Sequence, residues 1–386
     1  MNFSKRLKIE PSTTGVMNDL ATQKKNKGEK VYNLSAGEPM IDTSKIIVQA
    51  ALQTMSDGKT HYSPVSGIEE LKKASIKWMA NFYSANYYEN QVLITCGGKF
   101  VVFAALQCLL DTDDEVVVVG PHWVSYKPMV NLAGGVVKML DTNEEDDWDI
   151  NIKDLKFLIN NKTKAIILNN ASNPTGALYS KKRLKQVLQL ASENNLTVIS
   201  DEVYSGLVYD GDYISAGSFK EYQDNVLVVQ SCSKNFAMTG WRVGFAFGHE
   251  ELIKKIAILQ SQSITNTSTI SQWAAISALE NADKISQDIN KEMKKRRDVF
   301  VNKFNELFDC NIQAPPSSLY CFVSLDHFGI KETNSTKFCK DVLTNADIAI
   351  VPGVAFGKEG YVRFSFGAEE NELIEALGVL KKYLLE

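Results

Sequence analysis

The sequence predicts an α/β fold in which a mostly parallel seven-stranded sheet lies between helices, beside a smaller α+β domain. From Val92 to about residue 248, seven short apolar runs rich in β-branched residues alternate with longer segments of helical character. Continuous apolar runs of this kind are typical of strands buried on both faces of a parallel sheet. After residue 248 the pattern changes to a helical stretch, followed by a mixture of strand-like and helical segments.

The predicted strands of the large sheet are apolar and end in small or polar residues. In chain order they are 92–98 (VLITCGG), 115–120 (EVVVVG), 135–140 (GVVKML), 165–172 (AIILNNAS), 197–204 (TVISDEVY), 226–234 (VLVVQSCSK) and 243–248 (VGFAFG). The helical run 100–110 (FVVFAALQCLL) follows the first of them directly. This alternation of strands and helices is what a parallel sheet with crossover helices requires.

The second unit is mixed. The chain is helical and rich in Ser, Gln and Ala to about Lys295, and strand-like runs follow at 319–326, 348–353 and 362–367. An amphipathic helix is predicted at 373–386. No low-complexity linker or internal repeat separates the two units, so we expect them to pack against each other.

Composition excludes several classes of function. The 386 residues carry a net charge of −4 with both signs interspersed, which gives no electrostatic basis for binding nucleic acid or an anionic membrane. Neither a signal peptide nor an apolar run of membrane-spanning length is visible, so we expect a cytoplasmic protein. The six cysteines lack CxxC pairing and the four histidines lack metal-ligand spacing, so neither a disulfide nor a metal is expected. Small molecules are the expected partners.

Polar clusters stand at the carboxyl ends of three predicted strands. They are 172–176 (SNPTG), 201–204 (DEVY) and 231–234 (SCSK). Ligands of open α/β sheets bind outside the carboxyl ends of the strands, so we expect these segments to converge on one crevice.

A fourth element, 96–99 (CGGK), leads from a strand into a helix. Small residues there let backbone N–H groups approach an anion at the helix N-terminus. With Ser231 and Arg242, this element supplies a hydroxyl, a guanidinium and a dipole for one phosphate.

These motifs resemble the class I aminotransferases of pyridoxal 5'-phosphate (PLP) fold type I, and within them the bacterial-type aspartate aminotransferase branch. The resemblance runs almost end to end, through SAGEP, HYSPVSGIEEL, CGGK, HWVSY, NPTG, SDEVY, SCSKNFAMTGWRVG, SQSITN and VRFSFG. It implies a large PLP-binding domain at 45–285, with 1–44 and 286–386 forming an N-terminal arm and a small domain. It also implies a homodimer whose active sites borrow residues from the partner subunit.

The resemblance assigns the cofactor's ligands. Lys234 would carry PLP covalently and move the substrate's α-proton, and Asp201 would pair with the pyridine nitrogen. Tyr204 and Asn173 would contact the phenolic oxygen, and Trp123 would stack on the ring. The phosphate would be held by Gly97, Gly98, Lys99, Ser231 and Arg242, with Tyr62 reaching it from the neighbouring subunit.

The substrate's ligands follow from the same resemblance. Arg363 would grip the α-carboxylate in a two-point fork. Gly37 would offer a backbone contact, and Trp123 and Asn173 would also line the substrate. Lys99, helped by Ser12 and Thr14, would approach the second carboxylate of aspartate or glutamate. The predicted reaction is therefore amino transfer between L-aspartate and 2-oxoglutarate by a ping-pong mechanism.

Two residues depart from the family's pattern. His122 stands where a tyrosine is usual before the tryptophan, and Glu10 stands where relatives that accept prephenate tend to carry a basic residue. Prephenate is therefore disfavoured as a substrate.

Two alternatives remain open: an aromatic or prephenate aminotransferase, and a PLP-dependent lyase. A PLP-sensing transcription regulator on the same fold is disfavoured. The regulator would need a DNA-binding domain before the aminotransferase part. The family match already starts at PSTTG and no basic helix-turn-helix is visible.

Overall fold

The computed structural model describes residue 4, residue 7 and residues 9–330 and 332–385. Its centre is a seven-stranded sheet with the strand order β2-β8-β7-β6-β5-β3-β4. Only β8 runs antiparallel to its neighbours, β2 and β7. The strands are β2 (Val92–Thr95), β3 (Glu115–Val119), β4 (Val136–Leu140), β5 (Thr163–Asn169), β6 (Thr197–Asp201), β7 (Val226–Ser231) and β8 (Gly244–Phe247). The predicted fold class is thereby confirmed.

Helices cover both faces of this sheet. Along β3, Val116 and Val118 belong to one buried apolar cluster and Val117 to another, because successive side chains of a strand point to opposite faces. The Val116 face packs against α4 (Gly98–Leu109), α5 (Tyr126–Leu132) and α9 (Glu250–Ser263). The other face packs against elements that include α3 (Glu69–Tyr83), α6 (Ile152–Leu158), α7 (Lys181–Glu193) and α10 (Thr269–Glu280).

The smaller unit joins the two ends of the chain. Its antiparallel sheet has the order β11-β12-β9, and a second, two-stranded sheet pairs β1 with β10. The bounds are β1 (Tyr32–Asn33), β9 (Tyr320–Ser324), β10 (Ile348–Ala349), β11 (Val351–Pro352) and β12 (Tyr361–Ser365). Around them lie α1 (Thr13–Asn26), α12 (Ser335–Asn345) and α13 (Glu370–Leu385). Glu386, placed by the sequence in the last helix, lies outside the described residues.

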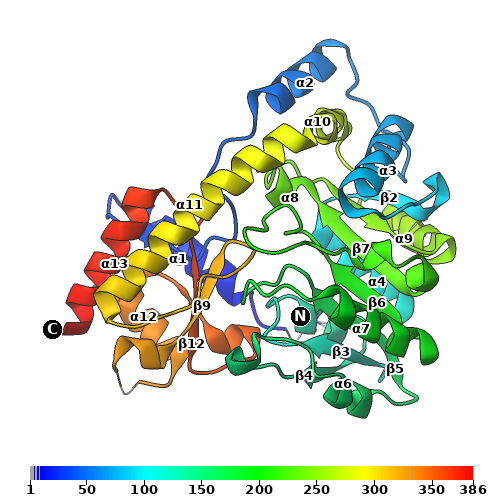
Figure 1. Ribbon diagram of the computed structural model, residues 1–386. Coiled ribbons are helices and arrows are strands. Elements are labelled where there is room, and N and C mark those ends of the chain that lie inside the picture. The colour runs from blue at the N-terminus through cyan, green and yellow to red at the C-terminus, as the bar shows by residue number, and fades with distance from the viewer. Residues whose placement is uncertain (1–3, 5–6, 8, 331, 386) are drawn as a thin grey trace.

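Long helices connect the two units. The helix α11 (Ala282–Phe308) extends past Lys295, where the sequence pattern placed the end of the helical stretch. It also runs without interruption through residue 285, where the family resemblance placed the end of the large domain. Figure 1 shows it passing from the side of α10 toward α13 and the small sheet. At the opposite edge, α2 (Lys45–Ser56) packs on α10 and keeps Ile46, Leu52 and Met55 exposed.

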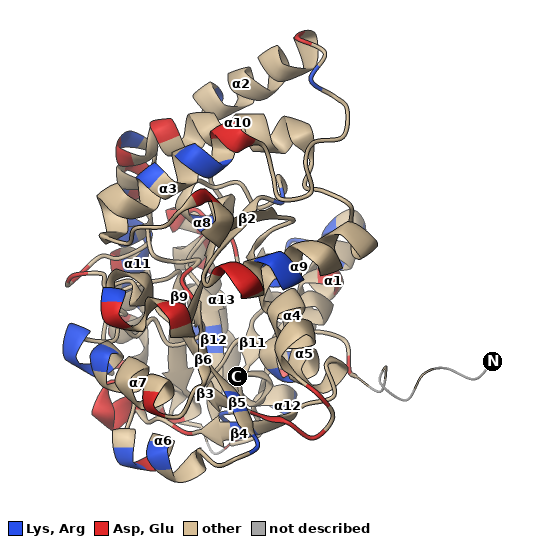
Figure 2. Ribbon diagram, turned by 90° about the vertical axis from the view of Figure 1, so that its right-hand side faces the viewer, with Lys and Arg blue, Asp and Glu red and all other residues tan. Residues whose placement is uncertain are grey.

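The visible helices carry Lys and Arg interspersed with Asp and Glu (Figure 2), as the charge pattern predicted. In the part of the chain that the structure describes, no helix combines the length and apolarity needed to cross a bilayer.

Candidate active site

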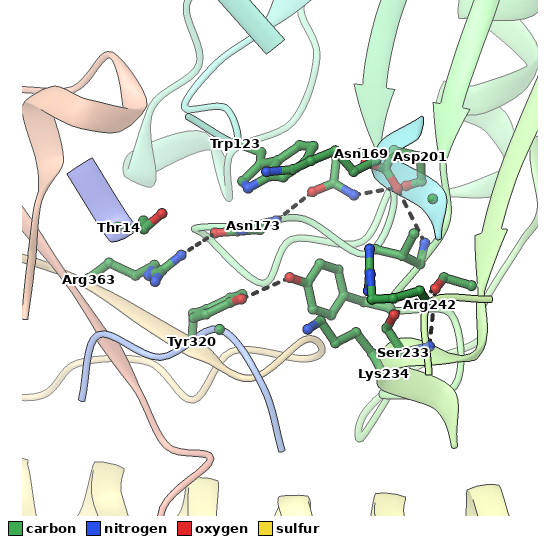
Figure 3. Close-up of a pocket in the computed structure, with 16 residues that line it drawn as sticks. Thr14, Trp123, Asn169, Asn173, Asp201, Ser233, Lys234, Arg242, Tyr320 and Arg363 are labelled. Carbon is green, nitrogen blue, oxygen red and sulfur yellow. Dashed lines mark hydrogen bonds between the residues drawn. The ribbon is translucent and has the colours of Figure 1, made fainter. Parts of the chain in front are cut away.

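A cavity of about 230 Å³ lies where β5, β6 and β7 end and the small sheet approaches. It collects most of the residues that the sequence singled out, as Figure 3 shows. Those that line it are Thr14, Gly37, Gly98, Lys99, Trp123, Asn173, Asp201, Tyr204, Ser231, Lys234, Arg242 and Arg363. The predicted convergence of the strand ends is therefore confirmed.

Lys234 faces the cavity from the short helix α8 (Cys232–Asn235), which directly follows β7. The hydroxyl of Ser231 caps this helix by accepting the N–H of Ser233 at 3.1 Å. Burial lowers the pKa of Lys234 to about 8, and Arg242 and Arg363 act in the same direction while Glu38 opposes them. Its Nζ makes no hydrogen bond or ion pair with the described residues. A partly deprotonated amine is therefore available in the cavity near neutral pH.

Asp201 ends β6 and is only 5% exposed. Burial raises the pKa of its carboxyl to about 6, although two hydrogen bonds favour the anion. The phenol of Tyr126 donates to Oδ2 at 2.6 Å, and the N–H of Val203 donates to Oδ1 at 3.4 Å. A buried carboxylate with a tyrosine donor is suited to hold a positively charged nitrogen.

In the turn after β5, hydrogen bonds of Asn169 connect Asn173 to the backbone of Asp201. Asn169 accepts the N–H of Asn173 at 2.7 Å and donates through Nδ2 to the carbonyl of Asp201 at 2.8 Å. The carbonyl oxygen of the Asn173 side chain in turn accepts from Nη1 of Arg363 at 3.0 Å. One chain of hydrogen bonds thus joins the ends of β5 and β6 to the small sheet.

Arg363 on β12 is 1% exposed, yet no carboxylate among the described residues pairs with it. Its Nη2 donates to the carbonyl of Ser35 at 2.8 Å, and Nε has no partner in the described part of the chain. The guanidinium lies 4.1 Å from the ring centroid of Tyr320 and 4.9 Å from that of Phe356. Burial lowers its pKa. A buried cation without a counter-ion marks a place for an anionic ligand.

A second cationic region surrounds the start of α4. A Cβ on Gly97 would lie 2.4 Å from Nη2 of Arg242, so only glycine lets this guanidinium lie against the turn. A Cβ on Gly244 would lie 2.4 Å from the carbonyl carbon of Gly97. Backbone, helix N-terminus and Arg242 therefore form a close-packed cradle of the kind that binds phosphate.

Lys99 follows this cradle, with its Nζ 4.9 Å from the ring centroid of Trp123. Burial and the neighbouring Arg242 lower its pKa. Thr14 also reaches the cavity from α1, and its hydroxyl lies 2.9 Å from that of Ser12. Ser12 itself lines a neighbouring cavity of about 1020 Å³, together with Lys99, His122 and Glu10.

The structure keeps Tyr62 apart from the site. Its side chain is 88% exposed and lies beside the segment 264–270, outside the cavity of the same chain. Gly97 and Ser12 do not line the cavity themselves. Gly97 lies against Arg242 and Ser12 is hydrogen-bonded to Thr14, and both of these neighbours line it. His122 is buried and binds the small unit, because its N–H donates to the carbonyl of Phe356 at 2.9 Å.

Sequence reasoning missed several residues of the site. They are Tyr126, Asn169, Val203, Ser233 and Tyr320. Ser233 lies within the recognised SCSK motif and Asn169 just before NPTG, so their strand-end positions were a usable signal. Tyr126 ends the HWVSY motif, which was also a usable signal, whereas Tyr320 carried none, because a tyrosine among apolar residues usually indicates core packing.

Among the described lining residues, four cations (Lys99, Lys234, Arg242 and Arg363) face a single carboxylate, Asp201. The fold and this site define an α/β enzyme that places a buried lysine and carboxylate against anionic small molecules. The sequence model for aminotransferase class I and II matches residues 29–380, and the chain belongs to this family.

Known proteins agree with this membership along the whole chain. The chain is 33% identical, over 98% of its own length and 97% of the relative's, to a probable aspartate/prephenate aminotransferase of Aquifex aeolicus. It is 32% identical to an aspartate aminotransferase of Bacillus subtilis, with 100% and 99% of the two chains covered. The structure of Thermus thermophilus aspartate aminotransferase with maleate superposes with a TM-score of 0.95 at 33% identity, covering 99% of both chains. The chain is therefore an aminotransferase, as its motifs predicted.

Proposed function

We propose that this enzyme transfers the amino group between L-aspartate and 2-oxoglutarate with PLP as its cofactor. One observation carries the substrate class: beside Lys234 and the cradle's Arg242, the cavity is lined by two further cations, Arg363 on the small sheet and Lys99 at the start of α4, and neither pairs with a carboxylate of the described residues. An amino acid with two carboxylates satisfies both. The names of the relatives, aspartate and aspartate/prephenate aminotransferase, support the same choice.

The cofactor's fit rests on the electrostatics of the cavity. The cradle of Gly97, Gly98 and Arg242, with the hydroxyls of Ser231 and Ser233, is suited to a phosphate. When bound, PLP supplies an electron sink for the electrons left at the substrate's Cα after deprotonation. The carboxylate of Asp201 would keep the pyridine nitrogen protonated, and Tyr204 and Asn173 would direct hydrogen bonds to the phenolic oxygen. Trp123 would cover the ring.

Proton transfer is the task of Lys234. Because burial holds the pKa of its amine at about 8, Lys234 is close to the balance between base and acid that a two-way proton shuttle needs. It would take the proton from the substrate's Cα and deliver it to C4' of the cofactor. Arg363 would orient the α-carboxylate by two parallel hydrogen bonds, which fixes the direction of the Cα–H bond. One site would then serve both half-reactions in turn.

We also propose a cytoplasmic homodimer that shares its active sites. The exposed apolar side chains of α2 and the nearly fully exposed Tyr62 are suited to contact a second copy. Tyr62 of the partner subunit would then reach the phosphate.

The test is a steady-state assay of the PLP-loaded protein with L-aspartate and 2-oxoglutarate, coupled to oxaloacetate detection. Phenylalanine as donor and prephenate as acceptor are run beside it, because Lys99 also lines the large neighbouring cavity. We expect the highest kcat/KM for aspartate. A preference for phenylalanine or prephenate would overturn the aspartate assignment, and stoichiometric release of ammonia would indicate a lyase.

A further inference from the structure

Tyr320 occupies a position in the site that none of the roles above uses. It lies on β9 and is 1% exposed. Arg363 on β12 pairs directly with Phe322, two residues further along β9, so Tyr320 and Arg363 point to the same face of the small sheet. Figure 3 shows both side chains turned toward the cavity.

The phenol of Tyr320 touches two functional groups at once. Its ring supports the guanidinium of Arg363, with 4.1 Å between Cζ and the ring centroid. Its hydroxyl lies 2.8 Å from the hydroxyl of Tyr204, and the two rings meet edge to face at 5.7 Å. A Cβ on Gly37 would lie 2.7 Å from this hydroxyl, so the glycine leaves the space that the phenol needs.

The hydroxyl, rather than the ring alone, needs an explanation. A phenylalanine would fill the same volume and support Arg363 equally well. A buried hydroxyl is costly unless it is bonded, and this one is satisfied by Tyr204. If Tyr320 donates its proton to the oxygen of Tyr204, the proton of Tyr204 stays free to be donated into the cavity, and each bond strengthens the next.

In the arrangement in which Tyr320 donates, Arg363 would set how strongly it does so. A cation over the face of a phenol ring draws electron density from it, which makes the hydroxyl a better donor. A carboxylate that docks on Arg363 neutralises this charge and weakens the donation. The charged groups that act on the two phenols are Arg363, Asp201 and Glu38, and the guanidinium is the one in contact with a ring.

We propose that Tyr320 is a positioning residue that couples carboxylate binding at Arg363 to the hydrogen bond that Tyr204 offers the cofactor. The inference rests on the proposed function, because it takes Tyr204 as the donor to the phenolic oxygen. Asn173 offers a parallel route, since it also contacts Arg363 at 3.0 Å. The two routes are separable by substitution.

The experiment titrates the visible absorption of the PLP-loaded protein with pH, with and without maleate as an unreactive dicarboxylate. A donor to an anionic oxygen lowers the pH midpoint, so loss of the Tyr320 hydroxyl should raise it. We expect Y320F to shift the midpoint upward by about half to one pH unit in the absence of maleate. The maleate-induced shift should shrink in Y320F, and the KM for aspartate should change less than about threefold.

Two further variants complete the design. Y320L removes the ring as well as the hydroxyl and should raise the KM for aspartate, because Arg363 loses its support. In a Y204F background, Y320F should move the midpoint no further if Tyr320 acts through Tyr204.

The proposal is overturned if Y320F leaves both the midpoint and the maleate shift at the wild-type values, or if the effects of Y320F and Y204F simply add. Either result in an enzyme that still transaminates aspartate rejects the coupling alone. Failure of the wild-type protein to transaminate aspartate would instead reject the proposed function.

Discussion

The phenol of Tyr126 donates a hydrogen bond of 2.6 Å to Oδ2 of Asp201, and both side chains are buried. Tyr126 is the first residue of α5, which follows β3 in the chain, and its ring also packs edge to face against Trp123, with 5.3 Å between centroids. One tyrosine therefore positions both the carboxylate and the indole that line the cavity.

The substitution Y126F should weaken cofactor binding. A hydrogen bond to a charged group contributes roughly 1.5–3 kcal/mol, so its loss should raise the pKa of Asp201 by about one to two units and lower PLP affinity by roughly tenfold. The measurement is the dissociation constant of PLP between pH 6 and 8. Y32F, which removes a hydroxyl bonded to Glu375, is the matched control and should bind PLP normally, because neither residue lines the cavity. Unchanged affinity in Y126F would contradict the role of this bond.

The amine of Lys234 should capture PLP with a characteristic pH dependence. Because the free amine is the nucleophile and its pKa is lowered to about 8, covalent uptake by cofactor-free protein should rise between pH 6 and 8 and level off above. The product is trapped with borohydride and located by peptide mass spectrometry, with K234A as the blank. A rate that still climbs steeply above pH 9 would show an ordinary lysine.

The buried carboxyl of Glu202 should make the stability of the folded protein depend on pH. Burial raises the pKa of this fully buried carboxyl to about 7, against an ordinary value of about 4.5, despite hydrogen bonds from Ser200 and the N–H of Ala216. The folded state therefore holds its proton longer than the unfolded state. The group's contribution to stability is complete below about pH 4.5 and is lost as pH rises to 7.

The variant E202Q stays neutral at every pH, whereas the wild type loses stability as Glu202 ionises. The free energy of unfolding of E202Q, relative to that of the wild type, should therefore rise by up to about 3 kcal/mol between pH 5 and pH 8. Urea unfolding of the cofactor-free protein at the two pH values measures this difference. The exposed Glu221, whose pKa is lowered and which pairs with Lys185, provides the control E221Q. A constant difference between E202Q and wild type would mean that Glu202 does not titrate in this range.

Gly244 on β8 lies directly against the backbone of the phosphate cradle, so a side chain at this position should disturb the cradle. A Cβ there would overlap the backbone of Gly97 and Gly98, which cannot rotate away as a side chain could. Overpacking of this kind costs about 1–3 kcal/mol, and here the displaced atoms belong to the cradle. G244A should therefore lower both the melting temperature and the affinity for inorganic phosphate or PLP. G240A, in the same segment with open space around its Cβ, should do neither.

Much of the fold was predictable because its signals are local. Strands buried on both faces are continuous apolar runs, and the polar residues that end them, such as Asp201 and Asn173, fall at one edge of the sheet. The helix α1 was missed because it starts with Thr-Thr-Gly, which are poor helix formers. The run 348–353 looked continuous but divides between β10, which pairs with β1, and β11, which pairs with β12. Its partners are distant in sequence, so no local pattern could show the division.

Lys99 is the residue that should separate aspartate from monocarboxylic donors. Its ammonium has no carboxylate partner among the described residues and faces the indole of Trp123, so an incoming carboxylate would be its first counter-ion. The substitution K99Q removes a charged contact worth about 1.5–3 kcal/mol, which corresponds to a loss of roughly ten- to a hundredfold in kcat/KM for aspartate. The kcat/KM values for alanine and phenylalanine should change little, because these substrates have no second carboxylate to pair with Lys99.

The control is K127Q, because Lys127 is exposed and lines the neighbouring cavity but not the cavity that holds Lys234. It should leave aspartate and alanine kinetics unchanged. If K99Q reduced kcat/KM equally for aspartate and alanine, Lys99 would serve the cofactor rather than the second carboxylate. Selective loss with aspartate would assign the second carboxylate to this lysine, since only the dicarboxylic substrate presents an anion at that end of the cavity.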